Sequence, residues 1–160
     1  MKHWLIKNLL SRKIRKEFIK KTDPLLLHIN DYPDRVYPGK QTKPDLHLNS
    51  DPFVRDVIMH IANSAAMTLE TQVELESSWV NWTNGKKKDI NWHIHNADYA
   101  LVYYMKILPF FDNGTLFKHE FIKVSQNSAL IFPAAMTHTA PSCPFHFDRY
   151  TLAMNLNIIR

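Results

Sequence analysis

Apolar and polar residues alternate with a period of two along much of the second half of the chain, and this pattern restricts that half to strand-rich folds. In residues 73–80, Val73, Leu75, Ser77 and Trp79 share one side of the expected strand, as they would if a single face were buried. Further strand-like runs cover residues 97–107, 115–124, 128–132 and 149–158. Short antiparallel strands this closely spaced predict a sandwich or an open-ended barrel with helices packed outside.

Two Asn-Gly pairs separate strand-like runs. Asn84-Gly85 follows the first run, and Asn113-Gly114 precedes the run at 115–124. Because Asn-Gly suits turns that need a positive φ, we expect chain reversals at both pairs.

The first 70 residues predict two helices and a connector. Residues 1–21 hold eight Lys and Arg against Glu17, with an apolar residue every fourth position from Ile6 to Phe18, which predicts a basic amphipathic helix. Such a helix could be merely solvated, or could bind nucleic acid or an anionic lipid surface. Four prolines mark residues 22–50 as an extended connector that could include one edge strand. A helix is expected over 51–70, begun by Asp51.

Composition indicates one globular domain over residues 1–160, with a β-rich core from residue 71 onward. Hydrophobic residues make up 45% and charged residues 22% of the chain, which is typical of globular proteins. The single cysteine, Cys143, permits no internal disulfide and fits a reducing compartment. No transmembrane segment or secretory signal is recognisable. We therefore expect a soluble, cytoplasmic protein.

His93 and His95 are two residues apart, so on a strand their side chains would point to the same face. Such a pair is either a polar patch or two ligands of one metal ion. A third ligand is available at His138, which follows the apolar run 128–132 and a proline turn. The alternative for His138 is a loop histidine that bonds a carbonyl.

Arg149 and Thr151 lie on the more polar side of the last expected strand. Turned into a barrel, a guanidinium and a hydroxyl at this spacing would suit a carboxylate, since each charge-assisted hydrogen bond contributes about 1.5–3 kcal/mol. The alternative is a surface ion pair of Arg149 with Asp148, which would contribute little.

Taken in order, these motifs resemble the iron(II)- and 2-oxoglutarate-dependent oxygenases, and more closely the small oxygenases of marine bacteria and phages. The resemblance covers about residues 73–158 and is carried by Glu76 to Asn81, His93-Ile94-His95, Val102-Tyr103-Tyr104, Leu130 to Pro133, His138, and Arg149 to Asn157. It implies a mainly β fold, a double-stranded β-helix or jelly roll preceded by the two N-terminal helices. It also implies Fe(II) as cofactor, 2-oxoglutarate as cosubstrate and O2.

Carried over position by position, the resemblance implies that His93 and His138 are iron ligands. It also implies that Arg149 and Thr151 bind 2-oxoglutarate. Tyr103 shares sequence parity with the paired histidines, so it is expected to reach the cosubstrate too. The family's first motif is usually His-x-Asp, whereas this chain has His95 at the aspartate position. His95 is the favoured third ligand and Asp98 a possible substitute.

The resemblance implies hydroxylation of an unknown substrate, with succinate and CO2 as co-products. Because three imidazoles also suit zinc, a cupin-like metalloprotein that does not use 2-oxoglutarate stays open, as does a non-catalytic jelly-roll binding module. Specificity is expected in the rim formed by residues 22–50 and 83–92, where Lys86-Lys87-Lys88 could meet an anionic substrate or could simply be a solvated hairpin tip.

Overall fold

The computed structural model describes residues 2–28, 39–85, 92–111, 113–141 and 145–160. The lysine run at 86–88 and most of the connector's centre lie outside the described residues. In chain order the elements are β1 (Trp4–Lys7), α1 (Arg12–Thr22), the 3-10 turn η1 (Asp23–Leu25), β2 (Leu27–His28), β3 (Lys40–Gln41), the 3-10 turn η2 (Leu46–Leu48), α2 (Pro52–Leu69), β4 (Val73–Asn84), β5 (Tyr99–Lys106), β6 (Gly114–Phe117), β7 (Glu120–Lys123), β8 (Ser128–Pro133), β9 (His138–Thr139) and β10 (Asp148–Ile158).

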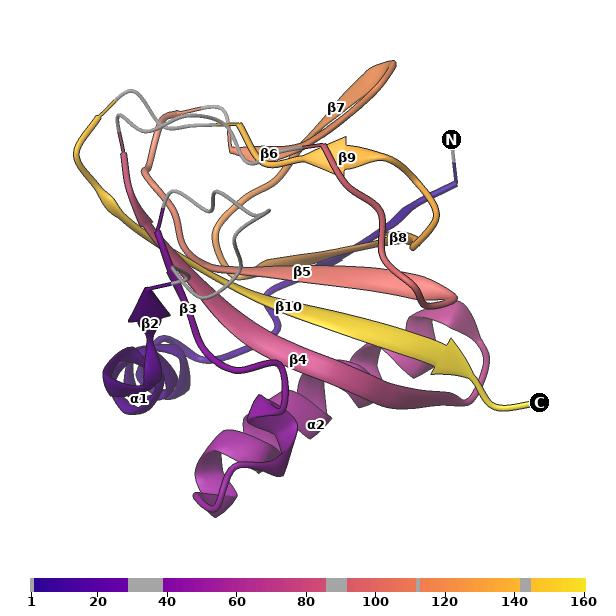
Figure 1. The fold of residues 1–160 in the computed structure, drawn as a ribbon, viewed down its shortest axis with the longest axis horizontal. Coiled ribbons are helices and arrows are strands. Elements are labelled where there is room, and N and C mark those ends of the chain that lie inside the picture. Colours follow the sequence, from indigo (N-terminus) through magenta and orange to yellow (C-terminus); the bar gives the residue numbers. More distant parts are fainter. Residues whose placement is uncertain (1, 29–38, 86–91, 112, 142–144) are drawn as a thin grey trace.

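The strands form two sheets, in agreement with the predicted mainly β architecture. The larger sheet has the order β1-β8-β5-β10-β4-β3-β2, and the smaller has the order β7-β6-β9. Helices α1 and α2 cover one face of the large sheet, while the small sheet lies over the other face (Figure 1). The protein therefore has three layers, and the space between the two sheets is distinct from the core beneath the helices.

Strand β10 lies at the centre of the large sheet, with β4 on one side and β5 on the other. Its central even-numbered residues, among them Leu152 and Met154, are buried against the helices together with Phe18 and Ile58. Its odd-numbered residues, which include Arg149, must then point toward the small sheet, because neighbouring side chains of a strand alternate between faces.

A β-bulge interrupts the pairing of β4 with β10. Asn155 pairs with Ser77, but the next residue, Leu156, pairs with Leu75, so the residue between them has no partner. An extra residue of this kind moves every side chain beyond it to the opposite face. The prediction that Leu75 and Trp79 share one face is therefore wrong: Leu75 packs against the helix core, whereas the Trp79 ring stacks on His95 between the sheets.

The expected helix over residues 1–21 is wrong in its first half. Residues Trp4–Lys7 form strand β1, which pairs antiparallel with β8 and is itself an edge of the large sheet. Asn127 holds the segment that follows, because its Oδ1 accepts from Leu10 N at 3.0 Å and its Nδ2 donates to Leu10 O at 2.8 Å. The helix begins only after Ser11, whose hydroxyl caps it. Pairing with β8 thus provides hydrogen bonds for backbone groups of residues 4–7, which the apolar periodicity had predicted to be helical.

The second expected helix is confirmed. Helix α2 runs from Pro52 to Leu69, and the Asp51 side chain accepts a hydrogen bond from Phe53 N. The Asp51 carboxylate also pairs with Lys21 at 2.6 Å, which joins the start of α2 to the end of α1. None of the described helices is both long and apolar enough to cross a membrane.

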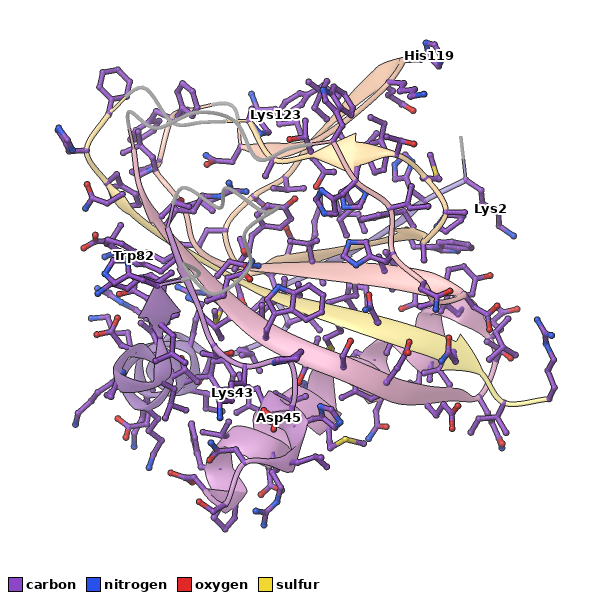
Figure 2. The ribbon with its side chains drawn as sticks, in the orientation of Figure 1. Lys2, Lys43, Asp45, Trp82, His119 and Lys123 are labelled. Atoms are coloured by element: carbon purple, nitrogen blue, oxygen red, sulfur yellow. The ribbon has the colours of Figure 1, made fainter. Side chains whose placement is uncertain are left out.

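The expected strand at 115–124 is instead a hairpin of β6 and β7, whose turn contains Lys118 and His119. His119 projects from the tip of this hairpin, away from the sheets (Figure 2). Gly85 has the expected positive φ, +46°, but the residues that would complete the reversal there lie outside the described residues. Near the second Asn-Gly pair the positive φ belongs to Phe110 and not to Gly114.

The helix layer provides a stability test at Phe18, which is fully buried, and Ile14, which lies one turn earlier and is 38% exposed. Phe18→Ala should lower the free energy of unfolding by about 3–5 kcal/mol, because it leaves a cavity between α1 and the sheet. Ile14→Ala should cost less than about 1 kcal/mol, as expected near the surface. Urea unfolding followed by circular dichroism measures both, and equal losses would contradict this packing.

Candidate metal centre

Backbone pairing brings the three predicted histidines together between the two sheets. His93 and His138 form an isolated antiparallel bridge, in which each backbone N–H donates to the other residue's carbonyl at 3.0 Å. His95 is fixed in the same segment, because its backbone N–H donates to Ala134 O at 2.9 Å. The segment around His93 thus lies along β9.

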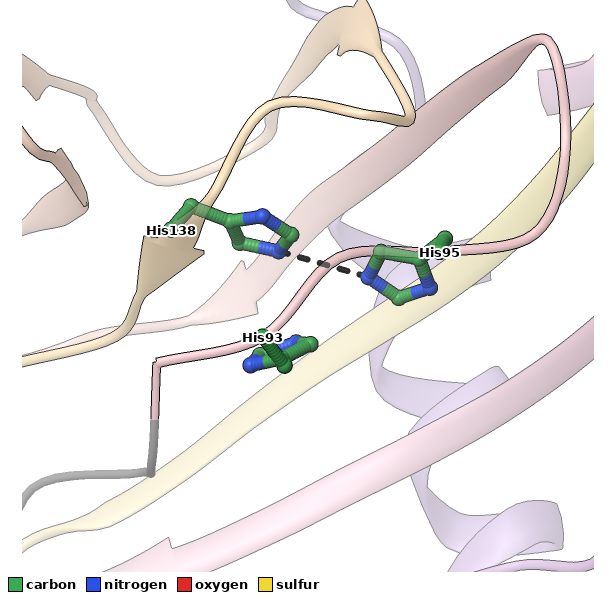
Figure 3. A group of neighbouring side chains, drawn as sticks. All are labelled: His93, His95 and His138. Atoms are coloured by element: carbon green, nitrogen blue, oxygen red, sulfur yellow. Dashed lines mark hydrogen bonds between the residues drawn. The ribbon is translucent and has the colours of Figure 1, made fainter.

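The three imidazoles point toward one another (Figure 3). One nitrogen from each of His93, His95 and His138 lies within 4.8 Å of the others, and the two Nε2 atoms of His95 and His138 are 3.3 Å apart. Nitrogens that bind one ion at about 2.1 Å lie about 3.0–3.4 Å apart. The arrangement is therefore compatible with a single shared metal ion.

His138 is prepared as a ligand by its surroundings. Its Nδ1 lies 2.8 Å from Met136 O, so Nδ1 carries the proton and the Nε2 lone pair points toward the other two imidazoles. The Phe132 and Phe117 rings pack beside it, with ring centroids 4.7 and 5.9 Å away. This burial lowers the pKa of His138 to about 4, with the Met136 carbonyl opposing the shift and His93 adding to it. The imidazole therefore stays neutral near pH 7, the form that binds metals.

Asp98 is not placed as a substitute ligand. Its Oδ2 accepts from Ile158 N at 2.8 Å, and its Oδ1 lies 3.5 Å from the guanidinium of Arg160. Among the described residues, the cluster able to hold an ion contains no carboxylate. Asp98 instead joins the end of β10 to the chain just before β5. Its carboxylate therefore has a structural role.

Arg149 and Thr151 face the same space as the histidines. The guanidinium carbon of Arg149 is 5.7 Å from the centroid of the Tyr104 ring, and its Nε is buried without a hydrogen-bond partner among the described residues. Asp148, the alternative partner for this arginine, accepts from Trp82 Nε1 and Asn84 Nδ2. A buried cationic donor without a partner is costly, so this position suits an anionic ligand.

Tyr104, rather than Tyr103, lies on the side of the site, so the prediction for Tyr103 is wrong. The Tyr103 hydroxyl donates to Asn127 Oδ1 at 2.7 Å, and its ring is part of the core beneath the helices. Bends at residues 96–98 separate the histidines from β5. Odd-numbered residues before and after these bends therefore do not point to the same face. Tyr104 is fully buried and shares a hydrogen bond of 2.5 Å with Thr115. Burial raises the pKa of the Tyr104 hydroxyl, which the nearby positive charge of Arg149 opposes.

Strand β6 connects the histidines to Arg149. Its residue Phe117 packs on His138, and Thr115 bonds Tyr104, which in turn lies beside Arg149. Two residues along a strand span about 7 Å. The histidines and the Arg149 guanidinium are thus linked through side chains of one strand on the same side of the layer.

Sequence reasoning missed two side chains of this site. Trp79 supports His95, with ring centroids 5.9 Å apart and planes inclined by 28°. Asn81 donates to Thr151 Oγ1 at 3.4 Å. Both are odd-numbered residues of β4, as Arg149 and Thr151 are of β10, but only the register of the two strands shows that they share a face.

Comparisons with known proteins identify the fold. No protein-family model and no curated protein matches this chain. Among solved structures, HygX from Streptomyces hygroscopicus with nickel and 2-oxoglutarate bound is similar, with a TM-score of 0.69 and 11% identity over 97% of this chain and 82% of HygX. The chain has the fold of the 2-oxoglutarate-dependent oxygenases.

Two further structures support this conclusion. The viral collagen prolyl hydroxylase of Paramecium Bursaria Chlorella virus-1, in complex with 2-oxoglutarate, has a TM-score of 0.69 and 14% identity over 96% of this chain and 94% of the hydroxylase. The α-ketoglutarate-dependent epimerase SnoN of nogalamycin biosynthesis has a TM-score of 0.75 and 11% identity over 97% of this chain and 76% of SnoN. The resemblance inferred from the motifs is therefore confirmed at the level of the fold.

The geometry predicts that metal binding depends on His138. His138→Ala should abolish binding of Zn(II) or Fe(II), because the remaining imidazoles cannot surround the ion and affinity falls by more than about 100-fold. His119→Ala, at the exposed hairpin tip, is the matched control and should bind as the unmodified protein does. Isothermal titration calorimetry, performed anaerobically for Fe(II), measures both. Unchanged affinity in His138→Ala would contradict the site.

Proposed function

We propose that this protein is an Fe(II)- and 2-oxoglutarate-dependent oxygenase that hydroxylates a substrate not yet known. The proposal is carried by one juxtaposition: the imidazoles of His93, His95 and His138 converge in the same layer as the buried Nε of Arg149, which has no hydrogen-bond partner among the described residues. A metal site alone would fit many proteins, but a metal site beside a guanidinium that needs an anion favours a carboxylate cosubstrate.

In this proposal the three histidines hold the iron, while Arg149 and Thr151 hold the distal carboxylate of 2-oxoglutarate. Bound Fe(II) and 2-oxoglutarate supply the oxidative chemistry, in which O2 and 2-oxoglutarate yield succinate, CO2 and a hydroxylated substrate. Phe117 and Phe132 exclude water from the His138 side. Trp79 keeps the His95 ring in place.

The absence of a carboxylate from the described histidine cluster has an electrostatic consequence. Three neutral imidazoles leave the 2+ charge of the ion uncompensated, whereas a carboxylate ligand would offset part of it. In the proposed complex the negative charge comes from 2-oxoglutarate. Metal and cosubstrate should therefore strengthen each other's binding by the same factor, as linkage requires.

The oxygenase proposal is tested with the Fe(II)-loaded protein. Anaerobic addition of 2-oxoglutarate should produce a weak visible charge-transfer band, and admitting oxygen should then generate succinate. His138→Ala, which lacks a metal ligand, is the control and should give neither signal. Absence of both the band and succinate from the unmodified protein would rule the proposal out.

A cupin-like three-histidine metalloprotein is the alternative that the experiments must separate, because the described cluster contains no carboxylate. Three imidazoles and one open position are a common zinc arrangement. Metal analysis combined with a thermal-shift assay separates the candidates. Tight zinc binding with no stabilisation by 2-oxoglutarate would support this second function.

Arg149 should control cosubstrate affinity without affecting the metal. Arg149→Ala should raise the KM for 2-oxoglutarate by about 10- to 100-fold, because the distal carboxylate loses a charge-assisted pair. Metal affinity should be unchanged, because Arg149 is not one of the three residues that would bind the ion. Steady-state kinetics and metal titration measure the two properties. Equal loss of metal and cosubstrate binding would contradict the clamp.

A further inference from the structure

Asn81 connects the edge of the large sheet to Thr151. Three neighbouring strands align Gln41 of β3, Asn81 of β4 and Thr151 of β10 in register. Gln41 Nε2 donates to Asn81 Oδ1 at 2.6 Å, and Asn81 Nδ2 donates to Thr151 Oγ1 at 3.4 Å. The three side chains form a single row of hydrogen bonds that ends beside Arg149.

The direction of this row determines what Thr151 can offer a ligand. A hydroxyl has one proton and two lone pairs. Because Asn81 donates to the Thr151 oxygen, the Thr151 proton is free to be donated elsewhere. If the Asn81 amide were reversed, the hydroxyl would donate to Asn81 and would present only lone pairs to a carboxylate, which repel it. In the structure Gln41 donates to Asn81 Oδ1, which leaves the Asn81 amide nitrogen facing the Thr151 hydroxyl.

We propose that Gln41 and Asn81 are positioning residues that fix the Thr151 hydroxyl as a donor to the distal carboxylate of 2-oxoglutarate. The inference rests on the proposed function and deepens it, because cosubstrate affinity becomes dependent on a side chain at the sheet edge. Gln41 acts only through Asn81 and does not need to touch the ligand. In this arrangement the Arg149 guanidinium supplies the positive charge that attracts the carboxylate. The Gln41 and Asn81 amides orient the Thr151 hydroxyl.

Gln41→Glu tests the direction of the row with a change of nearly equal size. A carboxylate at position 41 can only accept, so Asn81 must turn its amide nitrogen toward it and its oxygen toward Thr151. Calorimetry of Mn(II)-loaded protein with 2-oxoglutarate should show a Kd raised about tenfold or more, because a charge-assisted hydrogen bond is lost. The affinity for Mn(II) and the melting temperature without 2-oxoglutarate should not change.

Two controls separate direction from charge and from simple loss of contact. Lys40→Gln changes the net charge by the same amount as Gln41→Glu at the neighbouring residue, which pairs with Trp82 rather than Asn81, and should alter the Kd less than about twofold. Gln41→Met removes the bond without reversing it and should raise the Kd about threefold at most. Asn81→Leu, which removes the donor to Thr151, should fall between Gln41→Met and Gln41→Glu.

The outcomes distinguish this inference from the proposed function. If the unmodified protein binds no 2-oxoglutarate, the proposed function fails and the inference fails with it. If the unmodified protein binds 2-oxoglutarate but Gln41→Glu and Lys40→Gln shift the Kd equally, the positioning role is wrong and the oxygenase proposal stands. A large shift confined to Gln41→Glu, with Mn(II) affinity unchanged, supports the row of amides as the orienting device.

Discussion

The alternation of side chains along β10 is the constraint on which the rest of this structure depends. The strand pairs with β4 and β5 over most of its length, so its register is fixed on both sides. One face carries Leu152 and Met154 into the core beneath the helices. The other carries Arg149 and Thr151 toward the small sheet. A slip of one residue would exchange the two faces, placing the guanidinium in the apolar core and leucines in the site.

The candidate site combines elements that are distant in the sequence. His93 and His138 are brought together by a single backbone bridge, and Trp79 and Phe132 of the large sheet support the histidine rings. The three imidazoles lie in a partly apolar layer and could hold one metal ion, whose charge neutral ligands would leave to be balanced by a further ligand. A dicarboxylate held by Arg149 would supply that balance, which links metal binding and cosubstrate binding physically.

Local sequence patterns predicted where individual helices and strands lie better than they predicted which face of a strand each side chain occupies. The apolar period and the Asp51 cap gave helix α2 correctly, and the run before Pro133 gave β8. Parity failed wherever the chain was interrupted. Bends after His95 reversed the assignment of Tyr103, and a bulge in β4 moved Trp79 to the side of the histidines. Such irregularities arise from pairing with distant strands, so no short window of sequence contains them.

By itself, the sequence determined the strand-rich half, the residue types of a candidate metal and carboxylate site, and the order in which these residues occur. Those features follow from local chemistry, namely side-chain polarity and spacing. Only the tertiary structure decided that residues 4–7 leave the N-terminal helix to pair with β8, that Asp98 is used to hold the chain end, and that Gln41 and Asn81 reach Thr151. These outcomes depend on which backbone groups and side chains meet across the sheet, and that is set by the packing of the whole chain.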